Sequence, residues 1–344
     1  MPLSWSRAAS AAASVFLAAC SSPSDSPSGA ACGDGEVLQA GFYAFFEPVS
    51  YSADGDPGTD GFDEHLGYEA DLLTALASMD GASLSFARRG IADWSDIWLR
   101  AAGPEYDLVG GGITILDSRS RDASGERVVT FTSGHILFRQ SLLVRAADAG
   151  RLASHADLTS ADRVGVLRLT TGEFRLLELT GLVNAGGVLA AGTRVETDDG
   201  EIVADGTDAH TITPAGASAH LAGRLRLVPP ADDMPQVIYL DGPDGGEARE
   251  QDLLAALRTG EIDAIARGEI GNRDAGFASG GEFVVTALDE AVERGGFALA
   301  VEDAELAACL DDKINYLTDD LRLGYGDWRA DPAVFQARAA QWRP

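Results

Sequence analysis

From Glu36 onward the chain alternates between short strand-like runs and amphipathic helical segments, and this alternation constrains the fold more than any other feature. A first series consists of elements expected at 36–46, 67–79, 83–89, 94–102 and 106–112. Within the second of these, Leu72, Leu73 and Leu76 recur at helical spacing, which predicts an amphipathic helix. Strands that alternate with helices predict an α/β fold with mostly parallel strand pairing.

A second series follows the first without a linker rich in Pro, Gly or Ser. Its expected elements are strands at 162–169 and 263–267, helices at 172–182 and 253–261, and a long C-terminal helix at 304–321. A chain of 344 residues exceeds what one small domain needs, so we expect two lobes that are joined by strands. In such folds ligands bind at the carboxyl ends of strands and often between domains.

The region between Asn184 and Glu250 fits this pattern poorly, because it is acidic and rich in turn residues. We expect an inserted unit at about 185–250 that is either an expanded loop, partly disordered, or β-rich. His210 and His220 lie there among aspartates, which raises the hypothesis of a metal site. Their spacing matches no compact ligand pattern, and solvated loop residues are the alternative.

The N-terminal stretch has the marks of a secretory signal peptide. One early arginine, Arg7, precedes a short run of small and apolar residues that ends in LAAC at Cys20. The run is too short to span a bilayer, which needs about 20 residues. The pattern resembles a bacterial lipoprotein signal, with residues 1–19 removed and Cys20 acylated; ordinary signal cleavage nearby, with Cys20 incidental, is the alternative.

Residues 20–35 are rich in Ser, Pro and Gly and predict a flexible tether between the anchor and the folded body. Secretion places Cys32 and Cys309 in an oxidising compartment. They either pair with each other, or Cys309 is a buried thiol; the sequence leaves both open.

The formal net charge of −28 argues against several partners. A surface this acidic repels nucleic-acid phosphates and anionic membranes, so no nucleic-acid binding is expected. The chain has no zinc pattern, nucleophile–base set or phosphate-binding loop of convincing spacing, and we expect no cofactor and no metal.

One expected strand ends in three glycines, at Gly110, Gly111 and Gly112. Such an ending exposes backbone amides, and Thr114 and Arg119 add donors a few residues later. The cluster is suited to an anionic group, or it is an ordinary turn.

Several segments follow one another in the order and rough spacing of a known family. They are GYEADLLTALA, YDLVGGGITILDSR, VVTFT, VGVLRLTTGE and LRTGEIDAI. The chain thereby resembles family 3 extracytoplasmic solute-binding proteins, the polar amino-acid-binding components of bacterial ABC importers. The resemblance runs from about Glu36 to Trp342, apart from the region between Asn184 and Glu250. It implies an α/β, two-lobed periplasmic-binding-protein type II fold, with lobe 1 at 36–137 and 295–344 and lobe 2 at 138–294.

The resemblance also implies ligand-binding residues. Arg119 matches the arginine that grips the ligand carboxylate, and a guanidinium fork suits a carboxylate. The further implied contacts are Tyr43, Phe46, Trp94, Gly112 and Thr114 in lobe 1, and Thr170 and Thr171 in lobe 2. Each has a structural alternative: Arg119 as a turn cap, the aromatic residues as core, and Thr171 as an ordinary helix cap.

Two positions depart from the family pattern. Leu169 replaces a glycine just before Thr170, and Gly268 stands where members carry the acid that binds the ligand amine. Glu269 is adjacent and is our candidate for that acid. Without it the pocket lacks an ammonium partner, which puts α-amino acid binding in doubt.

The expected function is therefore capture of a small carboxylate-bearing solute for a membrane ABC permease. The protein is expected to be a monomer that is extracytoplasmic, held at the membrane by lipid on Cys20, and not an enzyme. The alternatives are a sensory or degenerate member and a periplasmic enzyme similar to a cyclohexadienyl dehydratase. For an enzyme, Glu47, Glu173 and Glu269 are the possible general acids.

Overall fold

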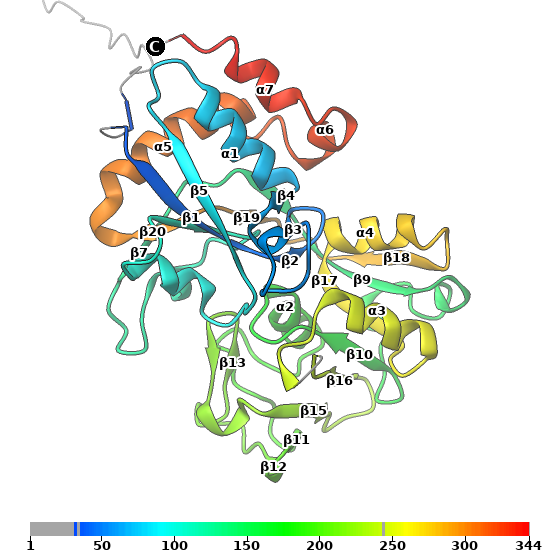
Figure 1. The fold of residues 1–344 in the computed structure, drawn as a ribbon. Coiled ribbons are helices and arrows are strands. Elements are labelled where there is room, and N and C mark those ends of the chain that lie inside the picture. Colours follow the sequence, from blue (N-terminus) through cyan, green and yellow to red (C-terminus); the bar gives the residue numbers. More distant parts are fainter. Residues whose placement is uncertain (1–30, 33–34, 243–244, 344) are drawn as a thin grey trace, which may run out of the picture.

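The structure is a computed structural model that describes residues 31–32, 35–242 and 245–343. The expected signal peptide at 1–19, Cys20 and the tether up to residue 30 lie outside the described residues. The chain forms two lobes, each built on its own sheet (Figure 1). The predicted α/β fold is confirmed.

The first lobe contains a five-stranded sheet in the order β5-β1-β6-β20-β7. β1 pairs in parallel with both β5 and β6, whereas β20 is antiparallel to its neighbours. The strands are β1 (Val37–Tyr43), β5 (Ser85–Ile91), β6 (Leu108–Gly110), β7 (Val129–Phe131) and β20 (Ala298–Ala300). The same lobe contains a separate small antiparallel sheet of β2 (Phe45–Phe46), β3 (Ser50–Ser52) and β4 (His65–Leu66).

Helices from both ends of the chain cover this lobe, as Figure 1 shows. They are α1 (Tyr68–Ser78), α5 (Ala304–Thr318), α6 (Tyr325–Ala330) and α7 (Val334–Ala339). The apolar stripe of α1 packs with the C-terminal helices in one core cluster, in which Leu72, Leu76, Leu310 and Phe335 are fully buried. The C-terminal segment therefore completes the lobe that the N-terminal segment begins.

The second lobe contains an eight-stranded mixed sheet in the order β12-β11-β15-β16-β10-β17-β9-β18. The strands are β9 (Gln140–Arg145), β10 (Arg163–Val166), β11 (Arg194–Thr197), β12 (Gly200–Val203), β15 (Arg224–Val228), β16 (Gln236–Tyr239), β17 (Ala264–Gly268) and β18 (Phe283–Leu288). Its helices are α2 (Thr171–Leu179), α3 (Glu250–Thr259) and α4 (Glu269–Ala278). β10 pairs in parallel with β16 and β17, as expected for βα units.

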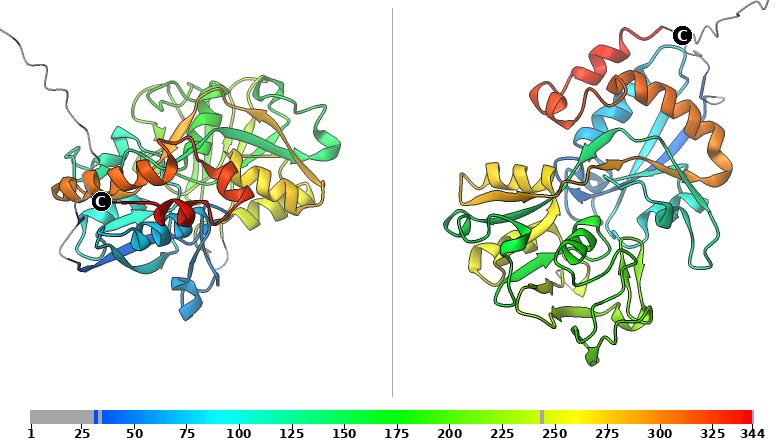
Figure 2. Two further views of the ribbon diagram at one scale, coloured as in Figure 1. Left: turned by 90° about the horizontal axis from the view of Figure 1, so that it is seen from above. Right: turned by 180° about the vertical axis from the view of Figure 1, so that it is seen from behind.

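The two lobes are connected by a two-stranded antiparallel ribbon of β8 (Ile136–Phe138) and β19 (Glu293–Gly295). The right view in Figure 2 shows the two lobes one above the other, with the chain crossing between them. The boundaries expected at 137/138 and 294/295 fall on this ribbon.

The acidic region at 185–250 contains six short β-strands, β11 to β16, in line with the β-rich alternative. It is not a separate appended unit, because β15 and β16 lie inside the main sheet of the second lobe. A short hairpin of β13 (Ile212–Thr213) and β14 (Gly216–Ala217) projects from it. Figure 1 shows this hairpin on the side of the second lobe that faces the first.

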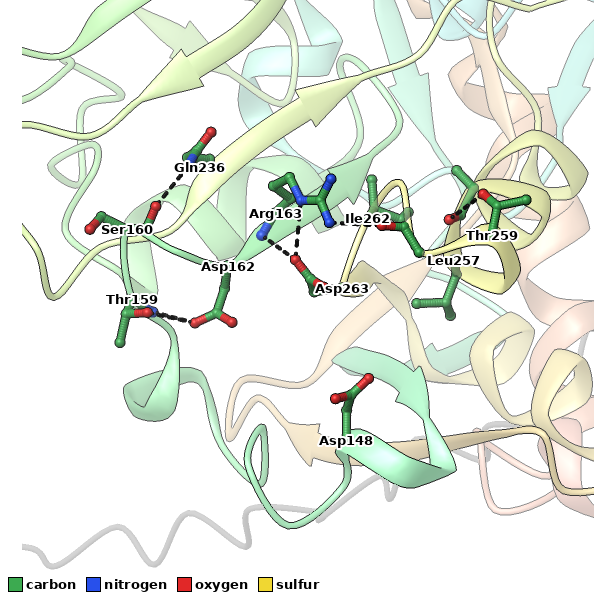
Figure 3. A network of polar contacts seen from close by, with 12 residues as sticks. Asp148, Thr159, Ser160, Asp162, Arg163, Gln236, Leu257, Thr259, Ile262 and Asp263 are labelled. Atoms are coloured by element: carbon green, nitrogen blue, oxygen red, sulfur yellow. Dashed lines mark hydrogen bonds and ion pairs between the residues drawn. The ribbon is translucent and has the colours of Figure 1, made fainter.

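Polar contacts fix the starts of the central strands of the second lobe (Figure 3). The Asp263 carboxylate accepts hydrogen bonds from the backbone N–H of Arg163 at 3.0 Å and from its Nε at 3.3 Å. The neighbouring Asp162 accepts from the backbone N–H and hydroxyl of Thr159, both at 2.8 Å. Asp263 therefore supports the amino ends of β10 and β17, at the opposite ends of these strands from Val166 and Gly268.

Cys32 and Cys309 form a disulfide that joins the first described residues to α5, with the two Cα atoms 5.4 Å apart. The sequence left open whether Cys309 pairs with Cys32 or is a buried thiol, and in the structure the two cysteines are paired. Among residues 31–32, 35–242 and 245–343, no helix combines the length and apolar character that a membrane crossing requires.

Candidate functional site

A cavity that is partly open to solvent is lined by residues of both lobes. Several of its lining residues follow the carboxyl ends of strands: Tyr43 ends β1, Gly112 comes after β6, Val166 ends β10, Leu240 follows β16 and Gly268 ends β17. This is where open α/β sheets bind ligands. Of the nine expected ligand contacts, the structure brings seven to this cavity: Tyr43, Phe46, Trp94, Gly112, Thr114, Thr170 and Thr171.

Aromatic side chains form much of the cavity wall. The first lobe and the connecting ribbon supply Tyr43, Phe45, Phe46, Trp94 and Phe138. The rings of Tyr43 and Trp94 meet edge to face, with centroids 5.1 Å apart. Tyr43 is only 5% exposed, and burial raises the pKa of its hydroxyl. These rings give the cavity an apolar wall that suits the body of a small organic molecule.

The glycine turn after β6 already holds an anion, and that anion belongs to the protein. The buried Glu69 carboxylate accepts the backbone N–H of Gly111 at 2.7 Å and that of Gly112 at 2.9 Å. Its Oε1 also lies 2.9 Å from Nε2 of His135. Gly111 and Gly112 have φ of 133° and 68°, which favour glycine. The sequence left open whether this turn receives an anionic group or is an ordinary turn. In the structure it receives the carboxylate of Glu69, so the amides of Gly111 and Gly112 are not available to a ligand.

The second lobe contributes the start of α2. Thr170 caps this helix, because its Oγ1 accepts the backbone N–H of Glu173 at 3.1 Å. Thr171 and Gly172 form the first turn and line the cavity. The first amides of a helix have no partner within the helix, and the helix dipole favours negative charge there.

A buried ion pair supports this loop from behind. Glu173 and Arg224 are both about 1% exposed, with Oε1 and Nη2 2.6 Å apart. The other oxygen of Glu173 accepts the backbone N–H of Leu169 at 2.6 Å. Leu169 has φ of 60°, a left-handed conformation that a glycine adopts without strain. The Glu173 contact therefore holds Leu169 in a backbone geometry that is costly for leucine.

A polar network joins the lobes beside the cavity. The Thr114 hydroxyl donates to Oε2 of Glu293 at 2.8 Å, and Nε2 of Gln140 donates to Oε1 of Glu293 at 2.9 Å. Gln140 Nε2 also donates to Oγ1 of Thr171 at 2.9 Å, and the two threonine hydroxyls lie 3.3 Å apart. Thr114, from the first lobe, is thus tied to Thr171, from the second, through the connecting strands.

Arg119 does not line the cavity, and its expected contact with a ligand carboxylate is not supported by its position. Its side chain is 1% exposed and donates to three backbone carbonyls: those of Pro214, Leu169 and Thr114. The guanidinium also lies 4.4 Å from the ring centroid of Trp98. Burial lowers the pKa of Arg119, while the Glu293 carboxylate acts in the opposite direction. Its donors are therefore used within the protein.

Glu269, the expected partner for a ligand amine, also lies away from the cavity. Its carboxylate pairs with Arg273 one helical turn further along α4, at 3.3 Å. Glu269 therefore does not supply the cavity with the acid that is missing at Gly268. Glu47 and Glu173, considered as general acids, do not line the cavity either.

Sequence reasoning missed several charged and polar lining residues, namely Gln140, Arg168, Glu247, Glu250 and Arg267. Glu247 crosses between the lobes: its carboxylate accepts the backbone N–H of Trp94 at 2.7 Å and that of Ser95 at 3.2 Å. It also accepts the Ser95 hydroxyl. The sequence gives only a weak indication that Glu247 is a site residue, because it lies in an acidic, turn-rich stretch where any carboxylate resembles a surface residue.

Arg267, which is buried, and Glu250, which is partly exposed, form an ion pair in the cavity wall. Nη1 of Arg267 lies 2.6 Å from Oε2 of Glu250. Burial raises the pKa of the Glu250 carboxyl, and the Arg267 charge acts against that rise. Arg267 immediately precedes Gly268, so the position that lacks the expected acid carries an arginine next to it.

The part of the chain that the structure describes contains no group of three or more His, Cys, Asp and Glu side chains placed to hold a metal ion. His210 Nδ1 and His220 Nε2 do approach to 2.9 Å, and Asp205 lies 3.7 Å from His210. Two imidazoles in contact with each other form a hydrogen-bonded pair.

No family model and no curated protein matches the chain. Solved structures do match it. They include holo ArgBP from T. maritima, at 17% identity and a TM-score of 0.51 over 83% of this chain and 93% of that one. They also include an amino acid ABC transporter substrate-binding protein from Streptococcus pneumoniae bound to L-arginine, at 15% identity and a TM-score of 0.53 over 88% and 93%.

A further match is the ancestral amino acid-binding protein AncCDT-1, described as a precursor of cyclohexadienyl dehydratase. It shares 17% identity with a TM-score of 0.51 over 89% of this chain and 95% of that one. At such identities the likeness concerns the fold. The chain has the two-lobed α/β fold of the solved substrate-binding proteins of amino-acid ABC transporters.

Proposed function

We propose that this protein captures a small carboxylate-bearing solute between its two lobes and delivers it to an ABC permease. The observation that carries the proposal is the cavity, which has aromatic walls from the first lobe and the start of α2 from the second. A solute there is held only when both lobes contact it, so binding favours the closed arrangement.

The start of α2 is the feature that selects a carboxylate. Thr171 and Gly172 line the cavity at the positive end of the helix dipole. The aromatic rings opposite bury the apolar part of the same molecule, which adds hydrophobic free energy to the polar contact.

Delivery requires that the protein stay near the membrane. We propose that lipid on Cys20 anchors it on the extracytoplasmic side, with a monomer as the working unit. The sequence around Cys20 supports this part of the proposal. The tether that the sequence predicted at 20–35 then ends at Cys32, because the disulfide with Cys309 fixes Cys32 to α5. The disulfide of Cys32 with Cys309 suits an oxidising compartment.

A thermal-shift screen of the mature protein against small carboxylates, amino acids and amines tests the proposed function. A ligand at 100 times its dissociation constant stabilises the folded state by about 2.7 kcal/mol. We expect carboxylates to raise the melting temperature and simple amines to leave it unchanged. If no carboxylate does so, the proposed function is wrong.

A matched pair of variants connects that result to the cavity. Thr171→Val removes a hydroxyl that lines the cavity, whereas Thr180→Val removes one at the other end of α2, where Oγ1 bonds to the Leu176 carbonyl. We expect weaker carboxylate binding only for Thr171→Val. Chemical conversion of a stabilising ligand by the protein alone would point to the enzyme alternative instead.

A further inference from the structure

The Glu247 carboxylate connects the lobes at a place outside the ribbon of β8 and β19. It belongs to the second lobe, just before α3, and its Oε2 accepts the backbone N–H of Trp94 at 2.7 Å. Its Oε1 accepts the backbone N–H of Ser95 at 3.2 Å and also the Ser95 hydroxyl. One charged acceptor thus receives three donors from the first lobe, and hydrogen bonds to a charged group are stronger than neutral ones.

Arg249 makes a similar crossing two residues later. Its guanidinium carbon lies 3.8 Å from the ring centroid of Phe45, and its Nη1 donates to the Gly55 carbonyl at 3.4 Å. Phe45 and Gly55 both belong to the first lobe, and the face of an aromatic ring attracts a guanidinium. We call Glu247, Ala248 and Arg249 the clasp.

The clasp is attached to a helix that is packed on the second lobe. The backbone N–H of Arg249 donates to the Asp252 carboxylate at 2.8 Å, and α3 begins at the next residue. Leu253 and Leu257 of α3 are fully buried in a core cluster of this lobe. The clasp therefore moves with the second lobe, and its contacts with the first lobe exist while the two lobes are close together.

The clasp joins residues that line the cavity. Phe45 and Trp94 line it from the first lobe, and Glu247 and Ala248 line it from the second. Trp94 is held at a further point, because its Nε1 donates to the Leu169 carbonyl at 3.0 Å. The backbone N–H and the indole N–H of this wall residue thus both bond to acceptors in the second lobe.

These contacts need no contribution from a solute, because each donor and each acceptor is a group of the protein. Glu247 is half-buried and Ser95 is exposed, so the contacts lie at the solvent-facing edge of the cavity. A lone surface ion pair stabilises a fold only slightly. Here three donors meet one carboxylate and a guanidinium stacks two residues away, so the contributions act together on one equilibrium, the approach of the lobes.

We propose that the clasp holds the two lobes closed before a solute binds. The inference goes beyond solute capture, because it concerns the free protein: the cavity is formed in advance and is not assembled around its ligand. A site that is already formed loses less conformational freedom on binding. The tests below use the mature protein without a solute, so their failure would leave the proposed function standing.

Small-angle X-ray scattering tests the closed arrangement directly. The protein is first dialysed in denaturant and refolded, which removes any solute that was purified with it. We expect the wild type to scatter as the closed two-lobed structure does. Glu247→Gln with Arg249→Gln removes the charge from both clasp contacts and should give a larger radius of gyration. Arg258→Gln with Glu282→Gln neutralises an exposed pair within the second lobe and should scatter like the wild type.

Hydrogen exchange followed by NMR is a second measurement, which detects rare opening and needs no change at Glu247. We expect the amides of Trp94 and Ser95 to exchange at least about 100-fold more slowly than in an unstructured chain. Arg249→Gln touches neither amide, yet it should reduce their protection about threefold. Arg258→Gln should not, although its guanidinium lies 5.1 Å from the ring centroid of Phe283 in its own lobe.

Three results would overturn the inference. The first is a free wild type that scatters as an open, extended pair of lobes. The second is a folded Glu247→Gln, Arg249→Gln protein that is as compact as the wild type. The third is exchange at Trp94 and Ser95 that Arg249→Gln does not change, and this result is informative even if the double variant fails to fold.

Discussion

The Arg119 guanidinium donates two hydrogen bonds to the carbonyl oxygen of Pro214, at 3.2 and 3.1 Å, across the boundary between the lobes. A third bond, at 3.1 Å, reaches the Leu169 carbonyl, also in the second lobe. Trp94 donates to that same carbonyl through Nε1 at 3.0 Å. Arg119 therefore holds the two lobes together.

Removal of this contact should destabilise the protein. We expect Arg119→Met to lower the free energy of unfolding by about 3 kcal/mol, because buried carbonyls lose charge-assisted hydrogen bonds. Urea denaturation measures the loss. Arg121→Met is the matched control, since Arg121 is half exposed and pairs with an exposed Asp117; it should stay within about 0.5 kcal/mol of the wild type. Equal effects of the two variants would contradict the role given to Arg119.

Glu69→Ala should be among the most destabilising substitutions in the first lobe. It leaves the amides of Gly111 and Gly112 and the imidazole of His135 buried without their acceptor. We expect a loss of about 3–5 kcal/mol in the free energy of unfolding. Glu64→Ala, on the exposed segment before α1, is the control and should have little effect. A loss below about 1 kcal/mol for Glu69→Ala would show that the turn does not depend on this carboxylate.

The Glu173–Arg224 pair should show strong coupling. Arg224→Met leaves a buried carboxylate uncompensated, at a cost of about 3–5 kcal/mol. Adding Glu173→Gln removes that charge, so the double variant should be more stable than Arg224→Met alone. The partly exposed pair Glu196–Arg226, on adjacent strands, should show a coupling below about 1 kcal/mol in the same double-mutant cycle. Additive effects at Glu173 and Arg224 would contradict the prediction.

His65 should make the protein less stable in mild acid. It is buried, stacks on Phe42 and lies 3.0 Å from the Ser50 hydroxyl. Burial holds its pKa well below the ordinary value of 6.5. The folded state therefore stays neutral while the unfolded state takes up a proton below pH 6.5. The contribution of His65 to the free energy of unfolding is complete above pH 6.5. It is lost as the pH falls from 6.5 toward the lower pKa that His65 has in the folded state.

Below pH 6.5 the wild type should lose up to about 1.4 kcal/mol of unfolding free energy per pH unit relative to His65→Gln. Urea titrations of both proteins between pH 7 and pH 5 give this difference directly. The prediction concerns only the slope of the unfolding free energy against pH. A constant difference in stability between the wild type and His65→Gln therefore does not affect the test. Parallel curves for the two proteins would rule out this linkage.

The parts of the fold that follow from local periodicity could be predicted from the sequence. The helix around Leu72 and Leu76 and the strand that ends at Gly110 depend on apolar spacing within one segment. The same holds for the position of Tyr43 and Thr171, since each comes at the end of a strand or the start of a helix. The carboxyl ends of parallel strands and the starts of the helices that follow them lie at the same edge of a sheet. This placement does not depend on which side chains the residues contact.

Contacts between distant charged residues could not be predicted, because they depend on which partner each charge meets in three dimensions. Arg119 was expected to face a ligand and meets the Pro214 carbonyl 95 residues away. Glu69 resembles a helix-surface residue in sequence, yet two glycine amides hold it in the core. Arg267 was overlooked, because its place in the cavity wall beside Glu250 depends on the folding of two segments that are separate in the sequence.

The most direct test of solute capture between the lobes is calorimetric titration of the wild type and of Gly268→Leu with the best stabilising carboxylate. A side chain at Gly268 enters the cavity without a backbone clash, so Gly268→Leu fills the site and leaves the fold intact. We predict one bound ligand per wild-type chain and at least a 100-fold loss of affinity in Gly268→Leu, with the free energy of unfolding unchanged within about 1 kcal/mol. Binding of equal strength to a well-folded Gly268→Leu protein would show that the ligand does not occupy this cavity.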